Sequence, residues 1–174
     1  MGKEIIIVTI SLGNDGAERI LTELARQWHH DGHEITVIQT SPNRYGTEYA
    51  LPEGIEQIQI HTTSSNKIIR FLQEIKALIG ILKQRPNATC LSFLSASSFI
   101  LAISSWFVKN RMVFSERNNP RKVPVGKHQQ MLRDFAFRFA DALVFQTEDA
   151  KSYFSKSIQS RGHIIPNPIN GNLP

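Results

Sequence analysis

Two short polar segments of this 174-residue chain carry the residue types that bind anions and handle protons. Residues 13–19 read Gly-Asn-Asp-Gly-Ala-Glu-Arg, and residues 115–121 read Ser-Glu-Arg-Asn-Asn-Pro-Arg. In the first segment, the small residues Gly13 and Gly16 let backbone N–H groups and a helix N-terminus approach an anion. In the second, Glu116 beside Arg117 combines the handling of protons or hydroxyl groups with anion binding.

Each segment also has a purely structural interpretation. A tight turn followed by a capping box, with Asp15 as the cap and Glu18 three residues later, explains the first segment without any ligand. A solvated loop before Pro120 explains the second, although its five charged or amide side chains exceed what a turn requires. The residue types alone leave both interpretations open.

Three other kinds of site are disfavoured. Gly13 and Gly16 lack the third glycine of a dinucleotide-binding loop, and Gln39 stands where an acidic ribose-binding residue belongs. His29 and His33 are separated by a helix-breaking Asp-Gly pair, so they should not share a face and no metal site is expected. No Gly-x-Ser-x-Gly elbow accompanies the serines, so hydrolase chemistry has no support.

The apolar pattern predicts the elements that position the two polar segments. A β-branched run at 5–10 indicates a buried strand, which is followed by a helix ending at Asp31-Gly32 and a strand at 34–38. The pattern continues as a loop at 41–54, strands at 55–60, 89–94, 112–115, 142–145 and 163–165, and helices at 66–84, 97–108 and 127–140 and after Thr147. This alternation predicts one α/β domain over residues 1–174, a Rossmann-like doubly wound parallel sheet in a three-layer α/β/α sandwich. Both polar segments then lie at carboxyl ends of strands.

Composition narrows the class of protein further. The chain is 41% hydrophobic and 20% charged, which is typical of a globular domain. Its first 30 residues lack the apolar run of a secretory signal, so no signal peptide is expected. Cys90 is the single cysteine, so a disulfide framework and a cysteine-based zinc site within one chain are excluded and a reducing compartment is expected. Residues 91–108 carry no charge, but their six serines favour a strand, a turn and a helix over a membrane span.

Positive charge is concentrated in the middle of the chain. Between Lys67 and Lys127 there are eleven basic and two acidic residues, a balance of +9, so the rest of this chain of net charge +5 carries −4. The segment predicts a polyanionic partner: a phosphorylated lipid, an anionic membrane surface, a nucleotide or a nucleic acid. A solvated face without a partner is equally compatible with the composition.

The predicted helix at 66–84 combines this charge with an apolar stripe at the i, i+3, i+4, i+7 spacing, which includes Ile68 and Leu72. Ile69 and Ile81 fall outside the stripe, so apolar side chains should stand beside basic ones on the exposed surface. Four basic residues of this helix are predicted to contact a membrane or another anion: Lys67, Arg70, Lys76 and Lys83. An ordinary core helix explains the stripe itself.

Four segments in order resemble the amino-terminal half of a retaining GT-B glycosyltransferase of family four. They are residues 11–19 (Ser-Leu-Gly-Asn-Asp-Gly-Ala-Glu-Arg), 115–120 (Ser-Glu-Arg-Asn-Asn-Pro), 140–148 (Ala-Asp-Ala-Leu-Val-Phe-Gln-Thr-Glu) and 165–169 (Ile-Pro-Asn-Pro-Ile). Any one segment is a weak signal, whereas the ordered set is specific and spans nearly the whole chain. The family usually has a second glycine where Asn14 or Asp15 stands.

The resemblance implies an enzyme with two Rossmann-like domains, of which the first binds the acceptor and the second, absent from this chain, binds the nucleotide sugar. It implies that Gly13 and Gly16 lie near the donor diphosphate, that Glu116 is catalytic, and that Arg117 and Asn118 contact the sugar or the acceptor. No metal and no cofactor other than the nucleotide-sugar substrate is expected. The implied acceptor is a polysaccharide or a lipid-linked glycan of the cell envelope, reached from the cytoplasmic face of the cell membrane.

These expectations have consequences for Glu116 and for the isolated chain. Because Glu116 follows a predicted strand, its carboxylate should face the cleft between domains, at a surface site where substitution leaves stability nearly unchanged. The 174-residue chain alone should be inactive. The alternative is a non-catalytic Rossmann-like module that binds nucleotide or nucleic acid through the basic segment. Nucleic acid is disfavoured because Trp106 is the only tryptophan or tyrosine there.

Overall fold

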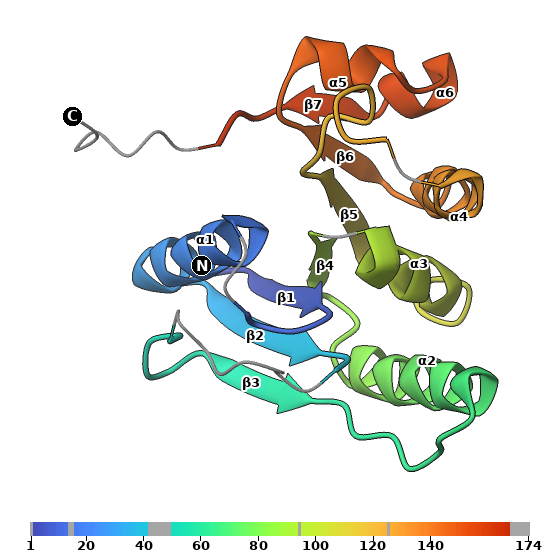
Figure 1. The fold of residues 1–174 in the computed structure, drawn as a ribbon. Coiled ribbons are helices and arrows are strands. Elements are labelled where there is room, and N and C mark those ends of the chain that lie inside the picture. Colours follow the sequence, from blue (N-terminus) through green and yellow to red (C-terminus); the bar gives the residue numbers. More distant parts are fainter. Residues whose placement is uncertain (1, 14–15, 42–49, 94, 125, 168–174) are drawn as a thin grey trace.

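The computed structural model describes residues 2–13, 16–41, 50–93, 95–124 and 126–167 and contains a seven-stranded sheet (Figure 1). The spatial order of the strands is β3-β2-β1-β4-β5-β6-β7, and every neighbouring pair is parallel. The strands are β1 (Glu4–Thr9), β2 (Glu34–Gln39), β3 (Glu56–Gln59), β4 (Thr89–Ser92), β5 (Arg111–Glu116), β6 (Ala142–Phe145) and β7 (Gly162–Ile164).

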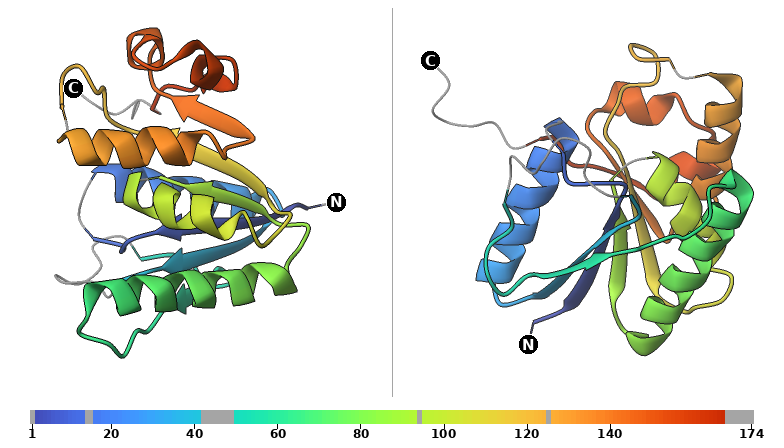
Figure 2. Two further views of the ribbon diagram at one scale, coloured as in Figure 1. Left: turned by 90° about the vertical axis from the view of Figure 1, so that its right-hand side faces the viewer. Right: turned by 60° about the horizontal axis from the view of Figure 1, so that its bottom comes forward.

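Helices cover both faces of this sheet. They are α1 (Gly16–His30), α2 (Lys67–Gln84), α3 (Ser95–Ser104), α4 (Lys127–Phe137), α5 (Glu148–Ser152) and α6 (Lys156–Gln159). Helix α1 lies on one face, while α2, α3 and α4 lie side by side on the other, with α3 in the middle (Figures 1 and 2). The predicted doubly wound, three-layer α/β/α fold is thus confirmed.

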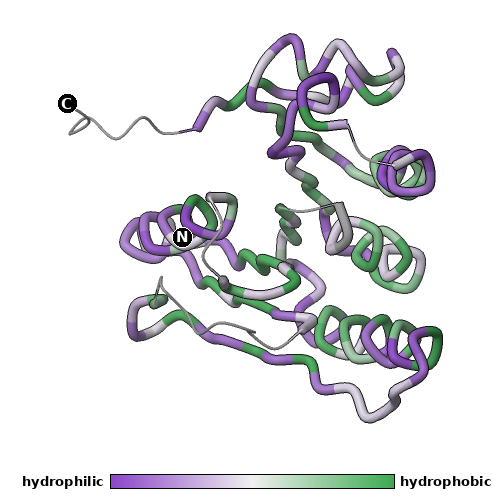
Figure 3. The backbone as a smooth tube through the Cα atoms, viewed as in Figure 1, coloured by the Kyte–Doolittle hydropathy of each residue, from purple (hydrophilic) through white to green (hydrophobic). Residues whose placement is uncertain are grey.

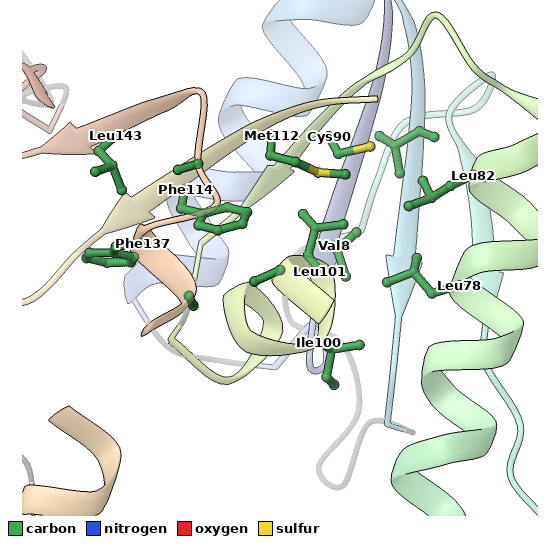
Figure 4. Packing of buried hydrophobic residues seen from close by; sticks show 14 of the residues in the cluster. Val8, Leu78, Leu82, Cys90, Ile100, Leu101, Met112, Phe114, Phe137 and Leu143 are labelled. Carbon is green, nitrogen blue, oxygen red and sulfur yellow. The ribbon is translucent and has the colours of Figure 1, made fainter. Parts of the chain in front are cut away.

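Two apolar cores hold the layers together. The β-branched run of β1 supplies both, because successive strand side chains point to opposite faces: Ile6 and Val8 join the core under α2, α3 and α4, and Ile7 joins the core under α1. Figure 4 shows the larger core, in which Phe114 and Phe137 pack side by side. Cys90 is buried in the same core, and burial raises the pKa of its thiol to about 12. Its thiol is therefore protonated and unreactive.

The structure departs from the predicted elements in small ways. Helix α3 ends at Ser104 and not at Val108, so Trp106 is exposed on a turn. Helix α6 was not predicted, because a single helical turn has too short an apolar period to detect. The predicted cap Asp15 and residues 42–49 of the predicted loop lie outside the described residues.

The uncharged stretch 91–108 contains the end of β4 and the helix α3, the strand and the helix that the serines indicated. In the part of the chain that the structure describes, no helix combines the length and the apolar character that a membrane crossing requires.

The strand order fixes where a ligand site can form. Strands β1 and β4 are neighbours, but the chain leaves β1 toward α1 on one face and leaves β4 toward α3 on the other. Such a switch point opens a crevice at the carboxyl ends of the strands, which is where doubly wound folds bind their ligands. All seven carboxyl ends lie at this one edge because every strand pair is parallel.

Candidate functional site

The start of α1 and the loops after β5, β6 and β7 enclose a hollow of about 470 Å³, here called the carboxyl-edge hollow. Its lining residues are Gly16, Ala17, Glu18, Arg19, Ile20, Arg117, Asn118, Gln146 and Asn167. The fold thus brings together three of the predicted site residues, Gly16, Arg117 and Asn118, from segments about one hundred residues apart. Charged and amide side chains dominate the lining, so the hollow suits a polar ligand.

Two arginines line this hollow, the exposed Arg19 and the half-buried Arg117. The guanidinium of Arg117 is the more closely surrounded of the two. It lies 5.2 Å from the ring centroid of Phe93 and donates a hydrogen bond to the side-chain oxygen of Asn167. Its Nε is buried and has no hydrogen-bond partner among the described residues. Burial also lowers the pKa of Arg117. An anion beside this guanidinium would offset the cost of burying its charge.

Amide groups stand beside the guanidinium. Gln146, directly after β6, donates from Nε2 to Oδ1 of Asn167 at 3.3 Å, and Asn167 follows β7. Amides both donate and accept hydrogen bonds, as sugar hydroxyls do. Our sequence reasoning did not assign Gln146 or Asn167 to the site. Their positions just after strands of a doubly wound sheet were the available signal.

The two glycines of the first segment play different parts. A Cβ atom on Gly13 would lie 3.0 Å from Oε2 of Glu18, so Gly13 makes room for that carboxylate. Glu18 is buried and accepts a hydrogen bond from the hydroxyl of Ser11 at 3.3 Å. Around Gly16 the Cβ position is open. The start of α1 therefore already holds a carboxylate beside Gly13, and the cations that line the hollow are Arg19 and Arg117.

Glu116, the last residue of β5, does not line the hollow. It is only 5% exposed, and its Oε1 accepts a hydrogen bond from the backbone N–H of Asn118 at 3.1 Å. Burial raises the pKa of Glu116, and the N–H of Asn118 and the charge of Arg133 oppose that rise. The expectation that Glu116 occupies a surface site was wrong, because its carboxylate folds back under its own loop. Glu116 thereby holds the loop that carries Arg117 and Asn118.

Arg133 on α4 is the buried partner of Glu116. Its Nη1 lies 3.7 Å from Oε2 of Glu116, and both side chains are at most 5% exposed. The guanidinium also lies 4.7 Å from the ring centroid of Phe154 and 5.4 Å from that of Tyr153, within cation–π range. The sequence did not reveal this residue, because its partners come from segments well before and after it.

The rest of the second polar segment is a structural loop. Asn119 donates from Nδ2 to Asp149 of α5 at 2.6 Å, and its own Oδ1 accepts the N–H of Arg121 at 3.0 Å. Arg121 in turn lies 3.7 Å from Asp149. The segment therefore combines both interpretations: Arg117 and Asn118 line the hollow, whereas Asn119 and Arg121 anchor the loop to α5.

The basic residues of α2 lie apart from the hollow. Lys67, Lys76 and Lys83 are exposed, and Nε of Arg70 lies 3.8 Å from Glu74. The predicted apolar stripe is buried only in part, because Ile68 and Leu72 in the first turns of the helix are exposed. Sequence periodicity missed this, since it shows which residues share a face but not where the neighbouring layer ends.

Not all of the central positive charge faces solvent. Arg85 follows α2, and its Nη2 lies 2.6 Å from the carboxylate of Glu56, whose pKa it lowers.

Among the described residues, no three His, Cys, Asp or Glu side chains lie close enough together to hold a metal ion.

Several solved structures share this fold. Anabaena HepE in complex with UDP has a TM-score of 0.72 at 13% identity, and the match covers 95% of this chain and 44% of that one. The lipopolysaccharide outer core galactosyltransferase WaaB has a TM-score of 0.72 at 11% identity, with 96% and 46% covered. Sucrose-phosphate synthase from Thermosynechococcus elongatus has a TM-score of 0.73 at 7% identity, with 94% and 48% covered. This chain therefore spans about half the length of these proteins.

Sequence comparison assigns the family. No curated protein matches the chain. The model of the family described as Glycosyltransferase Family 4 matches residues 14–172, which is nearly the whole chain. The match includes the start of α1 and all the loops of the carboxyl-edge hollow. The chain belongs to glycosyltransferase family 4, and its fold is that of the amino-terminal domain of a GT-B enzyme.

Proposed function

We propose that this chain is the acceptor-binding half of a retaining glycosyltransferase, which moves a sugar from a nucleotide-sugar donor to a polysaccharide or lipid-linked acceptor. The observation that carries the proposal is the buried, unpartnered Nε of Arg117 in a polar hollow, in a chain of glycosyltransferase family 4. A guanidinium attracts the anionic diphosphate of a nucleotide sugar or the phosphate of a lipid-linked acceptor.

The residues of the hollow suit the two parts of such a ligand. Arg117 would bind phosphate oxygens, while Asn118, Gln146 and Asn167 would hydrogen-bond sugar hydroxyls. HepE has been solved with UDP and with UDP-glucose, which supports a nucleoside diphosphate donor. Basic groups stabilise a leaving diphosphate as a cation does, so we propose a mechanism without a metal.

The proposed roles of the two domains follow from the share of the relatives' length that this chain covers. Residues 1–174 would form one acceptor domain, and the nucleotide-sugar domain would lie in the part of the relatives that this chain does not match. Glu116 is proposed as the catalytic carboxylate, a role that requires its side chain to turn from beneath its loop toward the hollow. Gly13 and Gly16 are proposed to lie near the donor diphosphate, Gly16 in the lining of the hollow and Gly13 beside the carboxylate of Glu18. The enzyme would act at the cytoplasmic face of the cell membrane in the synthesis of cell-envelope polysaccharide.

The 174-residue chain alone should fold and transfer no sugar, because one domain cannot align both substrates. The measurement is release of UDP or GDP from a panel of nucleotide sugars, compared between this chain and a protein that carries the donor-binding half as well. We expect turnover only from the longer protein. Turnover by the 174-residue chain, or its absence from the longer protein with every donor, would contradict the proposal.

A further inference from the structure

Large apolar side chains are exposed on α2 and α4, the two helices that flank α3. In the first turns of α2, Ile68 is 71% exposed, and Ile69 and Leu72 are exposed as well. On α4, Met131 is 63% exposed and Leu132 is also exposed. Helix α3 packs between α2 and α4 and has no charged residue (Figure 3). Exposed apolar side chains that gather on one side of a domain in this way often mark a surface that contacts a partner.

The exposed charge around these side chains is mainly positive. Helices α2, α3 and α4 contain six basic residues and two acidic ones, a balance of +4. Both acids lie close to arginines: Glu74 is buried and lies 3.8 Å from Arg70, and Asp134 accepts a hydrogen bond from Arg133 at 3.2 Å. The exposed lysines are Lys67, Lys76, Lys83 and Lys127. A partner must therefore offer negative charge next to an apolar phase.

Helix geometry places the two kinds of side chain together. Ile68, Leu72 and Lys76 follow one another at four-residue spacing along a single flank of α2. A lysine stem can lie along apolar surface while its ammonium group reaches outward. An anionic bilayer offers acyl chains to the apolar side chains and lipid phosphates to the lysine ammonium groups.

We infer that this outer surface of α2 and α4, here called the α2–α4 face, docks on an anionic lipid bilayer. The inference deepens the proposed function, on which it rests, because it brings the protein to where a lipid-linked acceptor resides. Both helices begin near the carboxyl edge of the sheet, since each follows the loop after a parallel strand, so the docked face adjoins the hollow's edge (Figures 1 and 2).

The test is sedimentation of the 174-residue chain with vesicles of phosphatidylcholine, with and without phosphatidylglycerol. We expect binding only to the anionic vesicles, weakened by salt because exposed charges are screened. Lys67→Glu/Lys76→Glu should lower the partition coefficient about tenfold or more. Ile68→Ser/Leu72→Ser should lower it as well, because both apolar anchors are lost. All four positions are exposed, so thermal unfolding should be unchanged.

The matched control is Lys109→Glu/Lys156→Glu, which changes the net charge equally at exposed lysines away from the α2–α4 face. It should retain most of the binding. Equal binding to neutral and anionic vesicles, or equal loss in the control, would overturn the inference. So would a dimer in the absence of lipid that Ile68→Ser/Leu72→Ser dissociates, because the face would then bind a second copy.

Failure of the membrane-docking inference can be distinguished from failure of the proposed sugar transfer. With a water-soluble acceptor, a protein that carries both halves should keep its turnover when Lys67 and Lys76 are reversed, because neither lysine lines the hollow. Vesicle binding without turnover on any nucleotide sugar would count against the proposed function and leave the docking surface standing.

Discussion

Replacing Arg133 with Met should lower the free energy of unfolding by about 3 to 5 kcal/mol at pH 7.5, because removal of one partner leaves a buried charge uncompensated. Glu116 is the charge left behind, and both side chains are almost fully buried. Met keeps much of the contact with Phe154, so the loss of charge dominates the effect. The measurement is urea denaturation followed by circular dichroism.

This loss should depend on pH in a defined direction. Burial already raises the pKa of Glu116, and loss of Arg133 removes a group that opposes the rise. The folded variant then holds a proton on Glu116 to higher pH than the unfolded chain, in which glutamate titrates near 4.3. Protonation of Glu116 therefore stabilises the folded variant at low pH. The free energy of unfolding of the variant falls as the pH rises through the pKa that Glu116 has in the folded state. The difference from wild type should be small near pH 4 and large near pH 8.

Two further variants test the cause. Arg138→Met, at the exposed end of the same helix, should change stability by less than about 0.5 kcal/mol. Glu116→Gln/Arg133→Met should recover most of the loss at pH 7.5, because neither buried side chain then carries a charge. A loss that is the same at pH 4 and pH 8 would show that Arg133 acts by packing and not by charge.

Turnover should respond most strongly to Glu116. In a protein that carries both halves, we expect Glu116→Gln to lower kcat about 10²-fold, the usual scale for loss of a group that transfers a proton. Burial raises the pKa of Glu116, which favours a carboxyl group that can hold and release a proton. Gln keeps an oxygen that can accept the N–H of Asn118, but it leaves the buried charge of Arg133 without its buried partner, so the melting temperature should fall.

Glu116→Ala separates chemistry from positioning. If Glu116 transfers a proton, Gln and Ala should reduce kcat to a similar extent, and the pH profile should lose one of its limbs. If Glu116 only holds the loop, Gln should retain near wild-type turnover while Ala raises KM and lowers kcat. Near wild-type turnover of Glu116→Gln would make Glu116 structural, because a lower melting temperature is expected under either hypothesis.

The architecture was predictable because its signals are local. The apolar pattern within β1 and within α1 indicates which of their own side chains are buried. The turn at Gly32 takes a positive φ, which favours glycine. Parallel strands then force the loops after β1 and β5 to one edge. Gly16, Arg117 and Asn118 could therefore be placed together from the sequence.

The side-chain environment within that edge was not predictable in the same way. Glu116 looked exposed because it follows a strand, but its burial depends on Arg133, which also packs over Tyr153 and Phe154. Such contacts join segments that sequence periodicity treats independently. The exposed turns of α2 escaped prediction for a related reason: periodicity is a property of one helix, whereas exposure at Ile68 depends on where α3 lies.

Sugar transfer by Arg117→Ala and Arg111→Ala variants tests the central claim most directly, which is that the carboxyl-edge hollow performs glycosyl transfer. The two arginines lie at opposite ends of β5. Arg117 directly follows the strand and lines the hollow, whereas Arg111 is the first residue of the strand and is exposed at the opposite edge of the sheet. The readout is transfer of a labelled sugar from a nucleotide sugar by a protein that carries both halves. We predict that Arg117→Ala lowers transfer about tenfold or more, whereas Arg111→Ala leaves it near the wild-type rate. Equal rates for the two variants would contradict the assignment of the site to this hollow.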